Sequence, residues 1–451
     1  MARRLTFVTL VLLTTITAVV SSLGAPLVPA ISANLDVPLE DAQWTLTATM
    51  VAGAVSTPVV GRFGSGRLRR PTILAGLLVV TLGTTLAALP FGLPTLLAGR
   101  TLQGVGLALV PLAFAVARDV WPGPRLPQVV AMLSVATVAG AGLGYPLTAL
   151  VAQSWGLAAA YWLGTALTGL TLLMAWAFVP SAAGEEPSPV DWPAAALVAL
   201  GLVGVLLAVS RGETWGWTSG RTTGAAALGV LLLAAWVRRT LRSPHPLVDL
   251  RLAVRPGLAG PNLVAVVAGI GMYSLLTLVI VLVQSDVPGW GLGEPVTVAG
   301  LVLVPYSVMS VVGSRLAQAV GRRFGDAVLL PTGCVVFLAA TVLLAVEHDH
   351  LWQVLACMAV GGLGSGFTFS SLAALMVPHV PRAETGSAMA FNQVLRYIGF
   401  AVGSASSVAL MTVYGGGPGE AGFRGALLTV AGVWLLAALA SAALSRRVPP
   451  A

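Results

Sequence analysis

Two arginines, Arg100 and Arg396, lie inside long apolar runs of the sequence. A guanidinium that faces lipid costs several kcal/mol, so we expect both side chains to face a protein interior or a water-filled cavity. There, an arginine can organise hydrogen bonds or attract an anionic group. For Arg100 the alternative is that its aliphatic stem carries the charge to the outer membrane surface.

Acidic side chains could carry protons across a membrane if they lay within such runs and were exposed alternately to the two sides. The sequence has 16 acidic residues, and we place none of them in the middle of an apolar run. Asp36 falls in a predicted outer loop, and Asp119 and Glu384 fall near predicted cytoplasmic helix ends. These three are the candidate proton sites, and weak or absent proton coupling is the alternative.

The elements that must position these residues are predicted to be transmembrane helices. The chain is 57% hydrophobic and 9% charged, with a mean hydropathy of +0.92, whereas soluble domains carry about a quarter charged residues. Apolar runs of roughly 20 residues recur, and a helix of that length crosses the roughly 30 Å hydrocarbon core. Barrel strands would instead alternate polar and apolar residues. The composition therefore predicts an all-α membrane protein in a lipid bilayer.

The net charge of +8 comes from arginine, because all 24 basic residues are arginine. Most of them fall in predicted cytoplasmic loops and tails, which is the usual asymmetry of membrane proteins. We therefore expect both termini in the cytoplasm and no nucleic-acid partner. Without lysine the chain has neither a complete phosphate-binding P-loop nor a Schiff-base amine, so those ATPase and enzyme classes are excluded.

Cysteine and histidine do not point to a disulfide or a metal site. Cys334 and Cys357 lie in predicted spans, where thiols serve as small apolar side chains. The tract from Glu347 to His350 could bind a metal, but we interpret it as a short solvated loop. We expect no metal and no other cofactor.

Charged and Pro/Gly-rich segments divide the chain into fourteen predicted helices. Residues 1–180 form an N-terminal half of six helices, residues 181–256 hold two inserted helices with cytoplasmic linkers, and residues 257–451 form a C-terminal half of six. An even count leaves both termini on one side. The predicted spans are 5–33, 43–62, 71–92, 94–118, 127–151, 157–179, 192–210, 222–237, 259–284, 295–319, 327–346, 350–376, 385–413 and 424–444.

The two six-helix blocks resemble each other. Residues 97–106 in the fourth span of the first block correspond to residues 355–364 in the fourth span of the second. Arginine pairs also end the loop after the second span of each block, at 69–70 and 322–323. Two parallel six-helix halves predict a transporter in which the halves rock about a substrate site near the midplane.

Four segments carry a family resemblance: Gln43-Trp44, residues 61–70, residues 100–108 and residues 246–252. Together they resemble the major facilitator superfamily, and specifically its fourteen-helix branch of drug:proton antiporters, which export multiple drugs and quaternary ammonium compounds. The resemblance covers nearly the whole chain. It implies the major-facilitator fold of two pseudo-symmetric halves, with two further helices inserted between them.

The family's loop between helices 2 and 3 reads Gly-x-Leu-x-Asp-Arg-x-Gly-Arg-Arg, and its acid holds the cytoplasmic ends of the halves together. Here Ser65 takes the position of the aspartate, and Gln318 does so in the second copy. Hydrogen bonds could therefore replace the lost charge. The alternative is that the arginines of these loops only fix the topology. In the fifth span the antiporter signature is present as Gly140, Gly144 and a displaced Pro146, for which helix packing is the alternative role. The resemblance assigns to the transport motifs Gly61, Ser65, Arg67, Arg69, Arg70, Arg100, Gln103, Gly104, Gly140, Gly144, Pro146, Gln318, Arg322 and Arg323.

The family's lining helices correspond to predicted spans 1, 2, 4, 5, 9, 10, 12 and 13 of this sequence. A cavity of aromatic residues with few polar groups suits amphiphilic or weakly polar organic substrates. Aromatic residues at helical spacing are also common packing residues, which is the alternative for each. The cavity candidates are Trp44, Asn262, Tyr273, Gln284, Tyr306, Phe367, Phe369, Phe391, Asn392 and Arg396.

These observations predict a secondary active transporter that exports small amphiphilic organic molecules, as in drug or metabolite efflux, by alternating access. The resemblance implies proton linkage, but Val20 lies near the position of the family's helix-1 aspartate, so we expect weaker dependence on a proton gradient than in relatives. An uncoupled facilitator of the same fold is the alternative. A membrane-embedded transferase is more remote, because the four histidines lie in loops and no acids converge. We expect a bacterial plasma-membrane protein that is a monomer and whose partners are a small-molecule substrate and protons.

Overall fold

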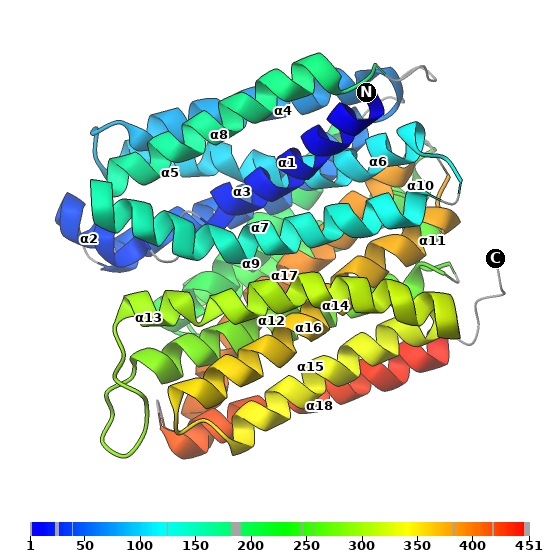
Figure 1. The fold of residues 1–451 in the computed structure, drawn as a ribbon. Coiled ribbons are helices and arrows are strands. Elements are labelled where there is room, and N and C mark those ends of the chain that lie inside the picture. Colours follow the sequence, from blue (N-terminus) through cyan, green and yellow to red (C-terminus); the bar gives the residue numbers. More distant parts are fainter. Residues whose placement is uncertain are drawn as a thin grey trace. The chain divides into compact units, whose positions relative to one another are not determined.

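The computed structural model describes residues 2–22, 27–37, 39–123, 125–181, 191–244, 246, 248–255, 257–381, 384–416 and 419–445. Helices joined by loops make up these residues (Figure 1), with no strand among them and one isolated bridge between Val287 and Trp290. Twelve of the helices are long and apolar enough to cross a membrane. The predicted all-α, multi-pass membrane class is confirmed.

The helices follow the predicted spans closely, because each begins or ends where charges, glycines or prolines interrupt an apolar run. They are α1 (Ala2–Ser22), α2 (Val28–Leu35), α3 (Leu39–Phe63), η2 (Gly66–Leu68), α4 (Arg69–Ala88), α5 (Leu93–Gly104), η3 (Val105–Leu109), α6 (Val110–Val120), α7 (Leu126–Trp155), α8 (Leu157–Phe178), α9 (Trp192–Trp215), α10 (Gly220–Arg242), α11 (Leu250–Ala253), α12 (Ala259–Gln284), α13 (Val296–Leu301), α14 (Leu303–Phe324), η4 (Asp326–Val328), α15 (Leu329–Val346), α16 (Leu351–Met376), η5 (Val377–His379), α17 (Thr385–Gly415) and α18 (Glu420–Ser445).

Two long helices stand outside the set of twelve. α3 has 25 residues and α7 has 30, and they occupy the predicted second and fifth spans. The predicted count of fourteen spans includes both, and that count stays a prediction.

Two predicted spans are divided into shorter elements. The first predicted span, 5–33, contains α1 and α2, and residues 23–26 between them lie outside the described residues. The fourth passes from α5 through η3 into α6, and the tenth is divided into α13 and α14. Pro111 and Pro305 lie just beyond these last two breaks, where each ring would clash with the carbonyl four residues earlier and so disfavours a continuous α-helix.

The chain forms two compact units, and the predicted boundaries near residues 180 and 257 remain a division by sequence. Unit 1 comprises Met1–Val205, Ala227–Arg251 and Val380–Val394, and unit 2 comprises Leu206–Ala226, Leu252–His379 and Leu395–Ala451.

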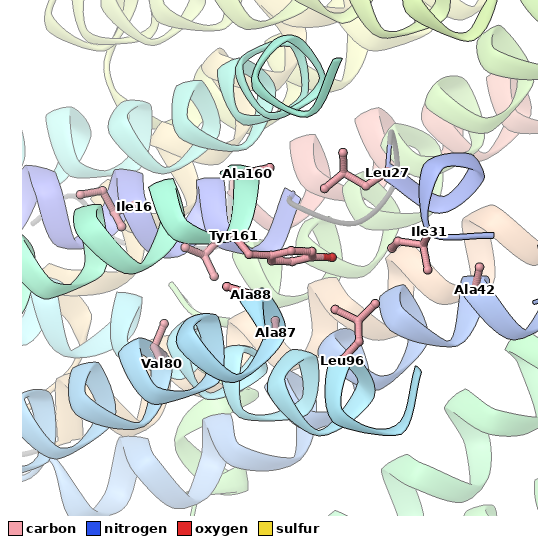
Figure 2. Packing of buried hydrophobic residues seen from close by; sticks show 11 residues of the cluster. Ile16, Leu27, Ile31, Ala42, Val80, Ala87, Ala88, Leu96, Ala160 and Tyr161 are labelled. Atoms are coloured by element: carbon pink, nitrogen blue, oxygen red, sulfur yellow. The ribbon is translucent and has the colours of Figure 1, made fainter. Parts of the chain in front are cut away.

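In unit 1, α1 packs on α7 and α8, α4 packs on α5 and α8, and α3 packs on α5. The ring of Tyr161, from α8, lies in the middle of a buried apolar cluster (Figure 2) that includes Val20, Val80 and Leu96. In unit 2, α16 packs on α14 and α15, and α18 packs on α12 and α15.

Glycines allow several of these helices to approach closely. A Cβ on Gly99 of α5 would lie 2.6 Å from the carbonyl oxygen of Gly83 on α4, and a Cβ on Gly140 of α7 would lie 2.5 Å from that of Thr15 on α1. Small residues permit such backbone contact in membranes, where van der Waals packing holds helices together. These contacts fix the helices that carry the charged residues described next.

Candidate functional site

Arg100 lies in the interior of unit 1, and its side chain is 0% exposed. Its Nη1 donates to the carbonyl oxygen of Val20 on α1 at 3.0 Å and to Oε1 of Gln103 at 2.5 Å, and its Nε donates to the carbonyl oxygen of Thr45 on α3 at 3.2 Å. The Oγ1 of Thr49, on α3, donates to the backbone carbonyl oxygen of Arg100 at 3.0 Å. The guanidinium therefore links three helices through hydrogen bonds.

The acceptor on α1 is a backbone carbonyl and not a carboxylate. Val20 lies near the position where the resemblance places an aspartate, and here its backbone carbonyl accepts from Arg100. A buried guanidinium needs its donors satisfied, and carbonyl oxygens can do this without an acid. The sequence could place Arg100 in the interior but could not identify Val20 and Thr45 as its acceptors.

The first motif loop and the helix ends near it form a charged cluster in unit 1. Arg62 at the end of α3 is paired with Glu384, just before α17, at 2.9 Å between Nη1 and Oε1, and the two side chains are 5% and 29% exposed. Arg69 at the start of α4 is paired with Asp119 at the end of α6, and its Nε donates to the carbonyl oxygen of Gly64 at 3.2 Å. Two of the three candidate proton sites are thus held in ion pairs by arginines.

A third arginine of this cluster, Arg118, also holds the start of α17. Arg118 of α6 donates from Nη1 to the carbonyl oxygen of Val380 at 2.5 Å and to Oγ1 of Thr385 at 2.6 Å. Nearby, a Cβ on Gly61 would lie 2.7 Å from the Cβ of Ala390, so α3 and α17 are in close contact. We call Arg62, Arg118, Glu384 and Thr385 the α17 latch.

The other residues of the first loop lie around this cluster. Arg70 donates to the carbonyl oxygen of Trp176 at 2.7 Å and to Oγ of Ser181 at 3.2 Å, and Arg67 is exposed. The hydroxyl of Ser65, which replaces the family's aspartate, is buried and has no hydrogen-bond partner among the described residues. Serine does not replace the missing acid, and a carboxylate is supplied to this loop by Glu384, just before α17.

The second motif copy, in unit 2, is arranged differently. Gln318 is half-buried, whereas Arg322 and Arg323 are exposed at the end of α14. The guanidinium of Arg323 lies 5.3 Å from the ring centroid of Phe324. Among the described residues, neither arginine takes part in an ion pair.

The remaining predicted motif residues lie within helices, and the third candidate proton site, Asp36, lies at the end of a helix. Gly104 and Gly140 are buried at helix contacts, and Gly144 accepts from Thr148 Oγ1 at 2.7 Å. The side chain of Pro146 lies outside the described residues. Asp36 is exposed at the end of α2 in the left-handed conformation, with φ 51°.

The cavity candidates are divided between the two units. In unit 1, Phe391 packs against Trp236 with ring centroids 6.5 Å apart, Asn392 is buried, and Trp44 is half-buried. In unit 2, the guanidinium of Arg396 lies over the ring of Phe369, and Tyr273 stacks on Phe400. Of the other unit 2 candidates, Asn262 donates to the carbonyl oxygen of Ala253 at 2.9 Å, and Gln284 is exposed at the end of α12. Tyr306 is buried, and Phe367 packs with Ala317 and Leu329.

Sequence reasoning missed a buried histidine, His348, and its partners at the predicted outer end of unit 2. His348 is buried, its Nδ1 lies 2.9 Å from the carbonyl oxygen of Leu344, and its Nε2 lies 2.9 Å from Oε2 of Glu420. Phe423 packs against its ring with centroids 4.9 Å apart. The sequence showed only a polar tract, because Glu420 is 72 residues away. Among the described residues, no three metal-ligating side chains form a cluster.

Comparison with known proteins identifies the family. The sequence matches the model of the Major Facilitator Superfamily over residues 10–346 and 262–451. It is 28% identical to a probable actinorhodin transporter of Streptomyces coelicolor over 393 residues, which cover 84% of this chain and 67% of that protein. It is 26% identical to a tetracenomycin C resistance and export protein of Streptomyces glaucescens over 393 residues, covering 85% and 71%.

A solved structure shows the same fold. The proton:xylose symporter of this superfamily superposes with a TM-score of 0.69 at 14% sequence identity, covering 99% of this chain and 95% of that chain. The specific fourteen-helix branch suggested by the sequence is a finer assignment than these matches make. The chain belongs to the Major Facilitator Superfamily and is a multi-pass membrane transporter rather than an enzyme.

Proposed function

We propose that this protein is a secondary active exporter of small amphiphilic organic molecules that works by alternating access. We place it in the bacterial plasma membrane as a monomer with both termini in the cytoplasm, and in the fourteen-helix drug-exporter branch. Its relatives include a protein named for tetracenomycin C resistance and export and a probable actinorhodin transporter. Export of organic molecules is the activity that these relatives support best.

The α17 latch is the observation that carries this proposal. By sequence, α17 belongs to the predicted C-terminal half, but its first residues are held in unit 1 by Arg62 and Arg118. Alternating access requires contacts at one end of the transporter that close and open in turn. Ion pairs and hydrogen bonds at helix ends can serve this purpose, because they break without disturbing a packed core.

We further propose that proton linkage acts through the α17 latch and the Arg69–Asp119 pair, and not through an acid in mid-membrane. Protonation of Glu384 would remove the charge that holds Arg62, and protonation of Asp119 would do the same for Arg69. Arg100 takes its acceptors from carbonyl oxygens and Gln103, so its network needs no acid. The alternative remains an uncoupled facilitator with the same fold.

Flux of fluorescent dyes in proteoliposomes tests both statements. We expect dye transport by the purified protein, and faster transport when a pH gradient is imposed than when an uncoupler abolishes it. Glu384→Gln should make the two rates more alike, because the latch can no longer respond to protons. Equal rates in the wild type with and without the gradient would favour the facilitator, and absence of flux for every dye of a chemically varied panel would count against export.

A further inference from the structure

In unit 2, a guanidinium lies over one aromatic ring, and three further rings pack together beside it on α12 and α17. The Cζ of Arg396, on α17, lies 5.0 Å from the ring centroid of Phe369 on α16. One turn along α17, Phe400 stacks on Tyr273 of α12, with centroids 4.3 Å apart and ring planes at 25°. Tyr397 packs edge-on against Phe400 at 5.9 Å. We call these five residues the arginine–aromatic cluster.

The backbone fixes the position of Arg396. A Cβ on Gly269 of α12 would lie 2.5 Å from the carbonyl oxygen of Arg396 and 3.0 Å from the Cα of Gly399, so α12 and α17 touch backbone to backbone. Further along, Oγ of Ser274 donates to the carbonyl oxygen of Gly403 at 3.0 Å. The crossing fixes the backbone of Arg396, and packing on Phe369 restricts its side chain, which lowers the entropic cost of binding a ligand.

Arg100 and Arg396, the two arginines inside long apolar helical segments, differ in their surroundings. Arg100 is fully enclosed, and its donors are directed to carbonyl oxygens and an amide oxygen. The side chain of Arg396 is half-buried, as are those of Tyr273 and Phe400. Part of the Arg396 side chain is therefore accessible, whereas that of Arg100 is not.

The chemistry of guanidinium suits a ligand that is both charged and aromatic. Stacking on Phe369 uses a face of the guanidinium plane, whereas hydrogen bonds to a carboxylate or sulfonate form at its edge. The two interactions are compatible, and such charge-assisted bonds are stronger than neutral ones. An aromatic ring on the ligand would in turn pack against the half-buried Tyr273 and Phe400.

We propose that Arg396 binds the acid group of an aromatic organic anion, and that the arginine–aromatic cluster makes such anions a substrate class of this transporter. The inference rests on the proposed export function and adds to it the charge and ring character of the substrate. Packing of Arg396 on Phe369 without any ligand is the competing interpretation, and a binding measurement separates the two.

The experiment measures the binding of two dyes to the purified full-length protein by fluorescence anisotropy, with no gradient present. Fluorescein and rhodamine 123 share a xanthene ring system, but fluorescein is anionic and rhodamine 123 is cationic. The variants are Arg396→Gln and, as a matched control, Arg315→Gln, which removes an exposed arginine of α14 in the same unit. Both substitutions change the net charge by the same amount.

We expect the wild type and Arg315→Gln to bind fluorescein more tightly than rhodamine 123. Arg396→Gln should weaken fluorescein binding by about ten-fold or more, as loss of a charge-assisted hydrogen bond does, and leave rhodamine 123 within about two-fold. The fluorescein affinity of Arg396→Lys should lie between those of the wild type and Arg396→Gln, because lysine keeps the charge but lacks the planar guanidinium. This variant also serves if Arg396→Gln does not fold, which size-exclusion chromatography and thermal melting would show.

Equal fluorescein affinity in Arg396→Gln and Arg315→Gln would overturn the inference. So would a wild type that prefers rhodamine 123 or binds neither dye. If fluorescein binds as predicted but proteoliposomes show no flux of any dye, the anion site stands and the export proposal fails. If rhodamine 123 is transported and fluorescein is not bound, export stands and the anion site fails.

Discussion

The two sequence repeats use their charges differently. In the first, Arg100 is enclosed among three helices, and Arg62 and Arg69 are paired with acids. In the second, Met358 stands where the repeat would place a counterpart of Arg100, it is fully buried, and the arginines at 322–323 are exposed. A repeated helix pattern thus supports a polar network in one copy and an apolar contact in the other.

The two repeats differ because, among the described residues, only the motif-loop arginines of the first repeat form ion pairs with carboxylates. Arg62 and Arg69 find carboxylates at the ends of other helices, and both are largely buried, whereas Arg322 and Arg323 face outward from α14. A surface ion pair is worth about 0–1 kcal/mol, but removing one partner of a buried pair leaves an uncompensated charge, at a cost of up to about 3–5 kcal/mol. Function should therefore be more sensitive to change in the first repeat.

The largest difference is expected between Arg100 and Met358. Arg100→Leu removes hydrogen bonds that join α1, α3 and α5, and we expect flux to fall by about 100-fold or more while membrane abundance stays nearly normal. Met358→Leu conserves apolar volume and should change flux by less than about two-fold. Dye flux in proteoliposomes, normalised to protein content, measures both. Normal flux in Arg100→Leu would make this arginine a topology anchor only.

A smaller difference is expected between the two motif loops. Arg62→Gln leaves Glu384 without its cation, and we expect flux to fall by about ten-fold, since a hydrogen bond to a charged group contributes about 1.5–3 kcal/mol. Arg322→Gln removes an exposed charge and should change flux by less than about two-fold. Equal losses in the two variants would show that both copies act alike.

Asp119 should matter less than Glu384. Its side chain is 38% exposed against 29% for Glu384, and its partner Arg69 has a further acceptor in the carbonyl oxygen of Gly64. We expect Asp119→Asn to lower flux by about two- to five-fold, as the loss of a partly exposed pair would. A defect in Asp119→Asn larger than that in Glu384→Gln would reverse this order.

The smallest effect on flux is expected for single substitutions of exposed arginines, because many arginines together define the topology. Cysteines placed at Arg242 and Arg322, both exposed, should react with a membrane-impermeant reagent only from the cytoplasmic side and leave flux nearly unchanged. The native Cys334 and Cys357 are buried and can be replaced by alanine for this purpose. Labelling of either new cysteine in intact cells would contradict the predicted orientation.

Much of the fold could be predicted because hydropathy and charge act locally along the chain. Runs of apolar residues predicted helices such as α12 and α16, and the cost of a charge in lipid predicted that Arg100 turns inward. The division between α13 and α14 departs from the prediction, which placed one continuous helix over residues 295–319. Periodicity and hydropathy do not reveal a break of this kind.

The partners of the charged residues could not be predicted, because they depend on long-range packing. Arg62 and Glu384 are 322 residues apart, and Arg100 reaches a carbonyl oxygen 80 residues away. Every residue has a carbonyl, so the sequence holds no signal for which one will accept. The acids near helix ends were noted as candidate proton sites, but only the structure joins Glu384 and Asp119 to the first motif loop.

Exchange of the charges at the α17 latch tests the central claim most directly. Dye flux should be compared among the wild type, Arg62→Glu, Glu384→Arg and the double variant that carries both substitutions. If the ion pair is what holds α17 in the transport cycle, each single variant should lose flux and the double variant should recover a large part of it. A double variant no better than either single one, or single variants with normal flux, would contradict the account.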